Sequence, residues 1–254
     1  MKYKNEFSFM VWGDYALFSD PITRVGGEKC SYSIPTPAAL IGILKSIYWK
    51  PTILFKIDSV KVINPIQTVS KGIRPIKYNG GNDLSMYTYL KDVKYAVKAH
   101  FVWNYNHPEL EADRNEDKHY QIIKRMIKLG GRRDIFLGAR ECQGYVEPCD
   151  FDKIKSCYDD GTNSEINFGL LYHSIIYPDE AVNEEDKGKL TVCFHTPVMK
   201  NGQIDFIQPE ECAIKRHIRE GKIKIFGKNQ IKTADEEFKE VCSSELDNGV
   251  KQNL

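Results

Sequence analysis

The strongest constraint on the fold lies in residues 93–103, where apolar side chains recur at every second position. A period of two is that of a β-strand with one buried face, so this segment predicts a strand. The same alternation at Phe7, Phe9 and Val11 predicts a first strand, and Ile53 to Ile63 indicates a second. The apolar positions of the longest pattern are Val93, Tyr95, Val97, Ala99, Phe101 and Trp103.

A helix is predicted between the first two strands. Thr36 supplies an N-cap and Pro37 suits the first helical position. Pro51 ends the helix, because proline cannot continue it. One face at helical spacing consists of Leu40, Ile41, Leu44, Ile47 and Tyr48.

A second helix is predicted after the long strand. Asp113 and Glu116 fit a capping box at its start, and Gly130-Gly131 ends it. Its apolar stripe is Ile122, Ile123, Met126 and Ile127.

The remaining segments complete an α+β architecture. A long polar connection precedes residue 93, and a fourth strand is expected within Ile135 to Val146. The order is then β-α-β-β-α-β, the ferredoxin-like arrangement shared by many RNA-binding modules. We therefore assign residues 1–149 to a ferredoxin-like domain.

The pattern changes to short strands and turns from about residue 150. Strands are expected at Leu170 to Ile176, at Leu190 to Phe194, and at Gln203 to Phe206 after a Lys-Asn-Gly turn. Residues 150–228 are thus predicted to form a smaller β-rich domain. Residues 229–254 are acidic, with few apolar positions, and are expected to form a frayed or partly helical tail.

Composition excludes some classes of protein. The net charge of +1 means that any basic surface must be local. No apolar run approaches the roughly 18 to 20 residues of a membrane helix, and the first residues lack an apolar signal core. The seven cysteines include no CxxC pair, which argues against a zinc site and for reduced thiols. A cytoplasmic protein without membrane contact is expected.

The predicted topology brings three polar side chains to one end of the helical layer. The first helix ends where the second begins, so Tyr48 meets Lys118 and His119. A phenol, an ammonium and an imidazole together can cleave RNA without a metal, and burial can tune their pKa values. The alternative is structural: a core histidine with satisfied hydrogen bonds, a packing tyrosine and a solvated lysine.

At this point four motifs resemble one family. They are GDYALFSDP (13–21), SYSIPTPAALIGILKSIYWKP (31–51), DRNEDKHY (113–120) and GGRRDIFLGARECQGYVEP (130–148). The chain resembles the type I-C "Cas five" CRISPR-associated proteins, members of the RAMP superfamily, over most of residues 5 to 210. The acidic tail is not part of the resemblance.

The resemblance implies an endoribonuclease that cuts precursor CRISPR RNA within the repeat. Such a protein then stays on the 5′ handle, beside the repeat stem-loop, as a subunit of the type I-C Cascade interference complex. The family's tyrosine falls on Tyr48, and its Lys-His pair falls on Lys118 and His119. No cofactor and no metal are implied.

Local positive charge is expected to hold the RNA. The glycine-rich segment matches the part of the family that contacts RNA, and glycines let backbone approach phosphate closely. A mobile clamp is a second possibility, in the long connection beside Gly80-Gly81, and a basic helix face that could equally be solvated is a third. The glycine-rich segment contains Arg132, Arg133 and Arg140. The long connection contains Arg74 and Lys77, and the helix face contains Lys124 and Lys128.

Two rival functions stay open. The protein could hold the handle as a non-catalytic scaffold subunit of the same complex. It could instead be a metal-dependent nuclease with His100, Asp113 and Glu116 as ligands, although these residues are scattered over a strand and a helix cap.

Overall fold

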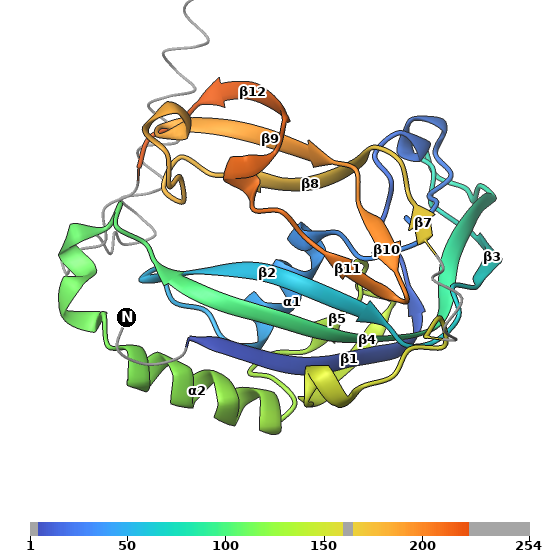
Figure 1. The fold of residues 1–254 in the computed structure, drawn as a ribbon. Helices are drawn as coiled ribbons and strands as arrows, with labels where there is room; N and C mark the ends of the chain where they lie inside the picture. The colour runs from blue at the N-terminus through green and yellow to red at the C-terminus, as the bar shows by residue number, and fades with distance from the viewer. Residues whose placement is uncertain (1–4, 160–164, 224–254) are drawn as a thin grey trace, which may run out of the picture.

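The computed structural model describes residues 5–159 and 165–223, which form an α+β protein with one large and one small antiparallel sheet (Figure 1). The large sheet has nine strands, in the order β5-β6-β1-β4-β2-β11-β10-β7 with β3 paired to β4. The small sheet has three strands, in the order β12-β9-β8. The two helices that frame the candidate site connect strands of the large sheet.

The centre of the large sheet contains the strands that the sequence predicts. They are β1 (Glu6–Ala16), β4 (Ser85–Trp103), β2 (Ile53–Val62) and β6 (Gln143–Pro148). β1 lies between β6 and β4, and β4 lies between β1 and β2. The apolar side of the alternation faces inward, since Phe9, Val97 and Phe101 are fully buried.

Helix α1 (Pro37–Ile47) begins as predicted and ends before Tyr48, short of the predicted stop at Pro51. The Thr36 side chain accepts a hydrogen bond from the Ala39 amide at 3.2 Å, so the N-cap is confirmed. Tyr48, expected in the last turn, instead follows the helix with φ −156° and ψ 135°. Its amide still donates to the Leu44 carbonyl at 2.8 Å. The extended backbone carries the phenol away from α1 and toward the second helix.

Helix α2 (Glu116–Lys128) ends as predicted but has a different cap. Gly130 and Gly131 follow it with φ values of 85° and 106°, which is the left-handed stop. The capping box at Asp113 was wrong, because the Asn115 side chain accepts from the Lys118 amide at 3.1 Å. Asp113 ends a preceding 3-10 turn (Pro108–Asp113), which leaves its carboxylate free for other partners.

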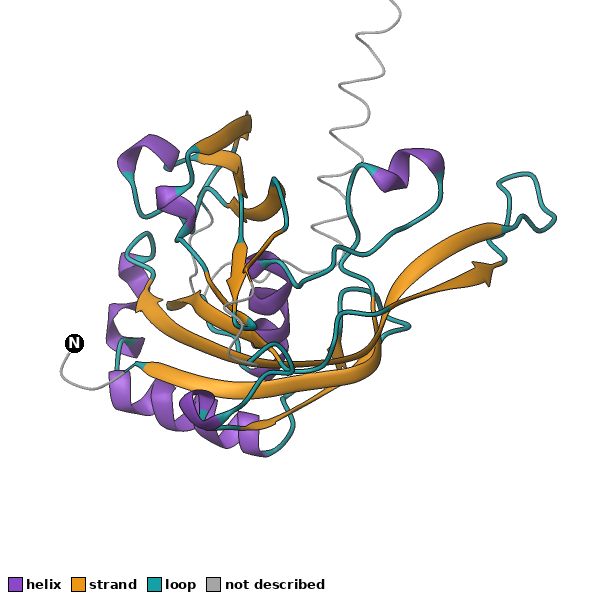
Figure 2. Ribbon diagram, turned by 45° about the vertical axis from the view of Figure 1, so that its right-hand side comes forward, coloured by secondary structure: helices purple, strands orange, loops and turns teal. Residues whose placement is uncertain are grey.

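The long polar connection predicted before residue 93 contains a strand, β3, which forms a β-hairpin with the first part of β4. β3 (Thr68–Ile73) pairs along Ser85 to Leu90 of β4, and the hairpin projects from the sheet (Figure 2). No side chain of β3 is fully buried. Its sequence therefore lacks the apolar alternation from which the other strands were recognised.

The predicted fourth strand is a hairpin of β5 (Ile135–Phe136) and β6, so the expectation of one strand within Ile135 to Val146 was wrong in detail. Gly138 lies in its turn with φ 91°. A Cβ atom there would stand 2.1 Å from the Leu17 carbonyl oxygen, so only glycine fits.

Strands from the second half of the chain belong to both sheets. The expected segments at 170–176, 190–194 and 203–206 are confirmed as strands, and Asn201 and Gly202 form the predicted turn with positive φ. The large sheet gains β7 (Glu165–Asn167), β10 (Val198–Lys200) and β11 (Gln203–Asp205), and the small sheet consists of β8 (Leu171–Ile176), β9 (Lys189–His195) and β12 (Ile214–Glu220). The other 3-10 turns are η1 (Thr23–Gly26), η3 (Phe151–Lys153), η4 (Glu184–Asp186) and η5 (Pro209–Glu211).

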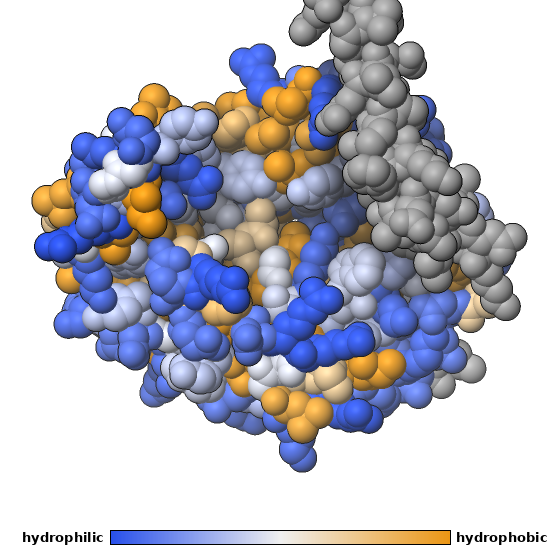
Figure 3. All heavy atoms as spheres, turned by 180° about the vertical axis from the view of Figure 1, so that it is seen from behind, coloured by the Kyte–Doolittle hydropathy of each residue, from blue (hydrophilic) through white to orange (hydrophobic). Residues whose placement is uncertain are grey.

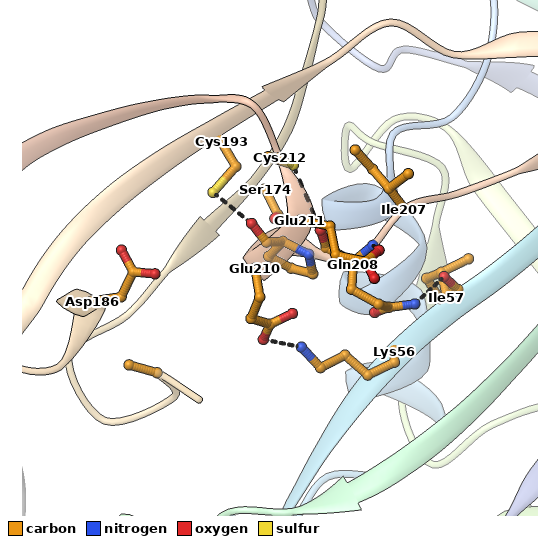
Figure 4. A network of polar contacts seen from close by, with 12 residues as sticks. Lys56, Ile57, Ser174, Asp186, Cys193, Ile207, Gln208, Glu210, Glu211 and Cys212 are labelled. Atoms are coloured by element: carbon orange, nitrogen blue, oxygen red, sulfur yellow. Dashed lines mark hydrogen bonds and ion pairs between the residues drawn. The ribbon is translucent and has the colours of Figure 1, made fainter. Parts of the chain in front are cut away.

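Polar contacts tie the turn before the small sheet's last strand to the large sheet (Figure 4). Lys56 of β2 forms an ion pair with Glu210, and Gln208 donates to the Ile57 carbonyl at 3.3 Å. The Cys193 thiol of β9 donates to the Pro209 carbonyl at 3.6 Å. The expected boundary near residue 150 stays a prediction, and the expected tail, 229–254, lies outside the described residues.

Figure 3 shows one face of the molecule. Hydrophilic residues make up most of what is visible there, and the hydrophobic residues form small separate groups. This pattern agrees with the 28% of charged residues in the chain. Among the described helices, none is both long and apolar enough to cross a membrane.

Candidate active site between the two helices

Tyr48 and His119 meet where α1 ends and α2 begins, as the topology predicts. The Tyr48 hydroxyl lies 2.9 Å from His119 Nδ1, across 71 positions of sequence. Both residues are buried, with exposed fractions of 4% for Tyr48 and 0% for His119. The pair therefore lies under the surface of the helix junction, with its polar atoms facing each other.

The hydrogen bonds of His119 define its tautomer. Nε2 lies 2.8 Å from the main-chain carbonyl of Asp113, which can only accept a hydrogen bond. In the neutral ring Nε2 therefore carries the proton, and Nδ1 accepts from the Tyr48 hydroxyl. The rings of Trp103 and Phe101 meet the imidazole edge-on, with centroids 5.6 and 6.3 Å away, and fix its plane.

Burial sets the charge states of the pair. It lowers the pKa of His119, and the positive charges of Lys118 and Lys50 lower it further, while Asp113 acts in the opposite direction. Burial, with a smaller contribution from Asp113, raises the pKa of Tyr48 to about 12. At neutral pH the imidazole is thus available as a base and the phenol holds its proton.

Lys118 is connected to the pair through Asp113. Its ammonium forms an ion pair with Asp113 Oδ1, and the Thr52 hydroxyl donates to Oδ2 at 2.7 Å. Burial raises the pKa of Asp113, but the hydrogen bonds from Lys118 and Thr52 outweigh it, so the pKa falls below its ordinary value. Asp113 stands five residues before Lys118 in the sequence, but the residues around it suggested a helix cap or a metal ligand and not this ion pair.

Of the predicted RNA-binding arginines, two follow α2 beside the site. The Arg133 amide donates to the Ser46 carbonyl at 3.1 Å, and the positive charge of Arg132 lowers the pKa of Tyr48 against the larger effect of burial. Arg140 lies in the turn between β5 and β6. All three side chains are exposed.

The other predicted RNA-binding residues lie elsewhere. Arg74 and Lys77 lie in the hairpin turn beyond β3, where Lys77 approaches Asp83 at 3.6 Å. Lys124 and Lys128 line a hollow of about 590 Å³ beside α2, and the Lys124 ammonium lies 5.2 Å from the centre of the Tyr120 ring. The hairpin and α2 are well separated in Figures 1 and 2.

The residues of the metal-dependent alternative are not grouped. His100 Nδ1 lies 2.8 Å from Asp58 on the neighbouring strand, whereas Asp113 contacts Lys118 and Thr52. Within residues 5–159 and 165–223, no cluster of three or more histidine, cysteine, aspartate or glutamate side chains could hold a metal ion. The arrangement therefore gives this alternative no support.

Comparison with known proteins adds independent information. A family model described as a CRISPR-associated protein, Cas5d, matches residues 8–207. A Mannheimia succiniciproducens protein named CRISPR pre-crRNA endoribonuclease Cas5d is 33% identical over 227 residues, covering 79% of this chain and 94% of that protein. A Thermus thermophilus protein of the same name is 31% identical over 150 residues, covering 55% of this chain and 62% of that protein.

A solved structure has the same fold. A crystal structure described as a CRISPR-associated protein superimposes with a TM-score of 0.69 at 39% identity, covering 83% of this chain and 96% of the other. The fold and the helix-junction site thus define an α+β protein of the CRISPR-associated class. The chain belongs to the Cas5d family.

Proposed function

We propose that this protein is an endoribonuclease that cuts precursor CRISPR RNA within the repeat and then holds the 5′ handle. The observation that carries the proposal is the buried hydrogen bond between Tyr48 and His119, beside the ammonium of Lys118. The names of the two curated relatives support the same activity and substrate.

The reaction we propose needs one proton removed and one returned. A ribose 2′-oxygen attacks the adjacent phosphorus, and its proton passes to Tyr48 as the phenol proton moves to His119 Nδ1. The bond from phosphorus to the 5′-oxygen then breaks, and the relay returns the proton to that oxygen. The products are a 2′,3′-cyclic phosphate and a 5′-hydroxyl. Positioned proton transfer of this kind contributes roughly 10²–10⁴-fold in rate.

The positions of the three side chains fit different roles. His119 is fully buried, so we assign it to accept the proton through Tyr48 and not from the RNA directly. The ammonium of Lys118, with 40% of its side chain exposed, can reach a phosphate and stabilise the negative charge of the phosphorane. No step of this scheme requires a metal.

The fold supports an RNA-processing module. The strand order β6-β1-β4-β2, with α1 and α2 as connections, supports the assignment of a ferredoxin-like unit. We infer that residues 1–149 carry the cleavage site and that 150–228 form the smaller β-rich part. Partners are then the other subunits of a type I-C Cascade complex, and a cytoplasmic location fits that role.

We infer that the RNA backbone is held close to the site by exposed arginines. Arg132 and Arg133 follow the glycines that end α2, and Arg140 lies in the glycine-containing turn of the β5-β6 hairpin. Guanidinium groups bind phosphates in a fork geometry, which positions the chain. Arg74, Lys77, Lys124 and Lys128 are secondary contacts in this proposal.

One experiment separates the enzyme from the non-catalytic scaffold. Purified protein is incubated with labelled repeat RNA in excess EDTA, and the product ends are analysed. We expect a single cut with a 2′,3′-cyclic phosphate end. Binding without cutting would favour the scaffold, and activity that returns only with magnesium or manganese would contradict the metal-independent scheme.

A further inference from the structure

We propose that Asp113 is a positioning residue of the cleavage site, which holds both Lys118 and His119 in their reactive arrangement. The inference rests on the proposed function and deepens it. Asp113 would not touch the RNA. Its carboxylate pairs with the ammonium of Lys118, and its main-chain carbonyl accepts a hydrogen bond from the imidazole of His119. Asp113 would act on the reaction through these two groups.

The contacts of Asp113 come from α2 and from the residue just before β2. One carboxylate oxygen pairs with Lys118 of α2, and the other accepts from the Thr52 hydroxyl, just before β2. The same oxygen, Oδ2, lies 3.5 Å from His119 Nε2, and the Asp113 carbonyl accepts from that nitrogen at 2.8 Å. Oδ1 of Asp113 therefore holds Lys118, while Oδ2 and the main-chain carbonyl oxygen both face His119.

A purely structural role explains this arrangement poorly. Asp113 does not cap α2, because Asn115 does. The Asp113 and Lys118 side chains are 32% and 40% exposed, and ion pairs this exposed contribute little to stability. The carboxylate nevertheless takes a second donor, Thr52, which fixes its orientation and leaves Oδ2 facing the imidazole.

The chemical effect follows from the charge of the carboxylate. When His119 takes up a proton, the imidazolium needs a negative partner, because the ring is fully buried. Of the charged and titratable groups that act on this ring, Lys118 and Lys50 oppose the added positive charge and Tyr48 is neutral. Asp113 supplies the favourable charge, as carboxylates behind catalytic histidines do in other enzymes.

The test compares three variants by single-turnover cleavage across pH, beside equilibrium RNA binding. Asp113→Asn keeps the shape and removes the charge. Asp113→Glu keeps the charge with a longer side chain, and Thr52→Val removes only the orienting hydroxyl. Circular dichroism and thermal melting show whether each variant folds.

We expect Asp113→Asn to lower the saturated rate by at least about 10-fold, and by up to the roughly 10⁴-fold loss seen when the aspartate behind a triad histidine is replaced with asparagine. RNA affinity should change less than about threefold, since the Asp113 side chain makes no contact with RNA in this scheme. The substitution then weakens only interactions that stabilise the transition state, and not those that bind the substrate. The limb of the pH-rate profile that reports His119 should move to lower pH, because the carboxylate raises the pKa of that ring. Thr52→Val should lower the rate less and leave the limb in place.

Wild-type rate and an unshifted limb in Asp113→Asn would overturn the inference. If Asp113→Asn does not fold, Thr52→Val decides: a lowered saturated rate at unchanged RNA affinity supports the inference, and a wild-type rate contradicts it. The proposed function fails differently, through a His119→Ala protein that still cuts. A His119→Ala protein without activity beside a fully active Asp113→Asn protein would refute only the role of Asp113.

Discussion

Replacing Tyr48 with phenylalanine tests the central hydrogen bond of the site. The substitution removes one oxygen and keeps the ring, so packing between α1 and α2 is preserved. His119 Nδ1 then loses the partner that lies 2.9 Å away. Because His119 is fully buried, water cannot replace that partner.

The loss can be estimated in both stability and rate. An unsatisfied buried acceptor costs about 1–3 kcal/mol in the free energy of unfolding. For a domain of this size that corresponds to a fall of about 2–12 °C in Tm. Removing a positioned proton-transfer group lowers the cleavage rate by roughly 10²–10⁴-fold. A large loss of rate should thus accompany a moderate loss of stability.

The assay is single-turnover cleavage of repeat RNA, with differential scanning calorimetry on the same protein. Tyr89→Phe is the matched control, because this buried phenol donates to Glu141 at 3.2 Å and does not contact the helix junction. We expect the control to lose some stability and to cut at the wild-type rate. Tyr48→Phe cutting within about threefold of wild type, despite a lowered Tm, would refute the reasoning and return the bond to a packing role.

Three further predictions concern the site, the arginines that follow α2, and a buried histidine of β9. His119→Ala should abolish cleavage and leave filter binding unchanged; a rate within about tenfold of wild type would contradict it. Replacing Arg132 and Arg133 together should weaken RNA binding and reduce the slope of log affinity against log salt by about 1 to 1.5, measured over a salt series. Burial lowers the pKa of His195 to about 4, so the free energy of unfolding should fall by up to about 3 kcal/mol as the pH drops from about 6.5 toward 4. Denaturant melts of His195→Leu should show a free energy of unfolding that depends less on pH.

The sign of the last prediction follows from proton binding. The folded protein keeps His195 neutral, whereas the unfolded chain takes up a proton below about pH 6.5. The stabilisation is therefore complete above that pH and declines in acid.

For the salt series, a variant with Lys124 and Lys128 replaced together serves as the comparison. A change of slope in it equal to that of the double-arginine variant would place the RNA on α2 instead.

Much of the fold could be predicted from periodicity, because long alternating or helical patterns record which side chains are buried. The strand at Val93 to Trp103 and the meeting of Tyr48 with His119 both followed from that pattern and from connection order. β3 could not be predicted, since neither of its faces is fully buried and its sequence therefore lacks a clear apolar side.

The chemistry of Asp113 could not be predicted for a different reason. Its sequence neighbours fit a capping box equally well, and the deciding contact is Thr52, which lies 61 positions away. Local patterns carry no information about such a partner. Lys118 is a different case, because its partner Asp113 lies five positions before it. Its ammonium forms an ion pair with that carboxylate and not with the tyrosine and histidine beside which it was expected.

The pairing of β11 with β2 has a consequence for shortened forms of the protein. Residues Gln203, Ile204 and Asp205 cover Lys61, Val60 and Ser59 of β2. A chain cut after residue 149 would leave that strand with unpaired N–H and C=O groups along an open edge. Such edges pair with other molecules. We therefore expect the isolated N-terminal part to self-associate, and the Asp205 carboxylate, which accepts from Ser59 at 2.7 Å, to be among the contacts that prevent it in the whole protein.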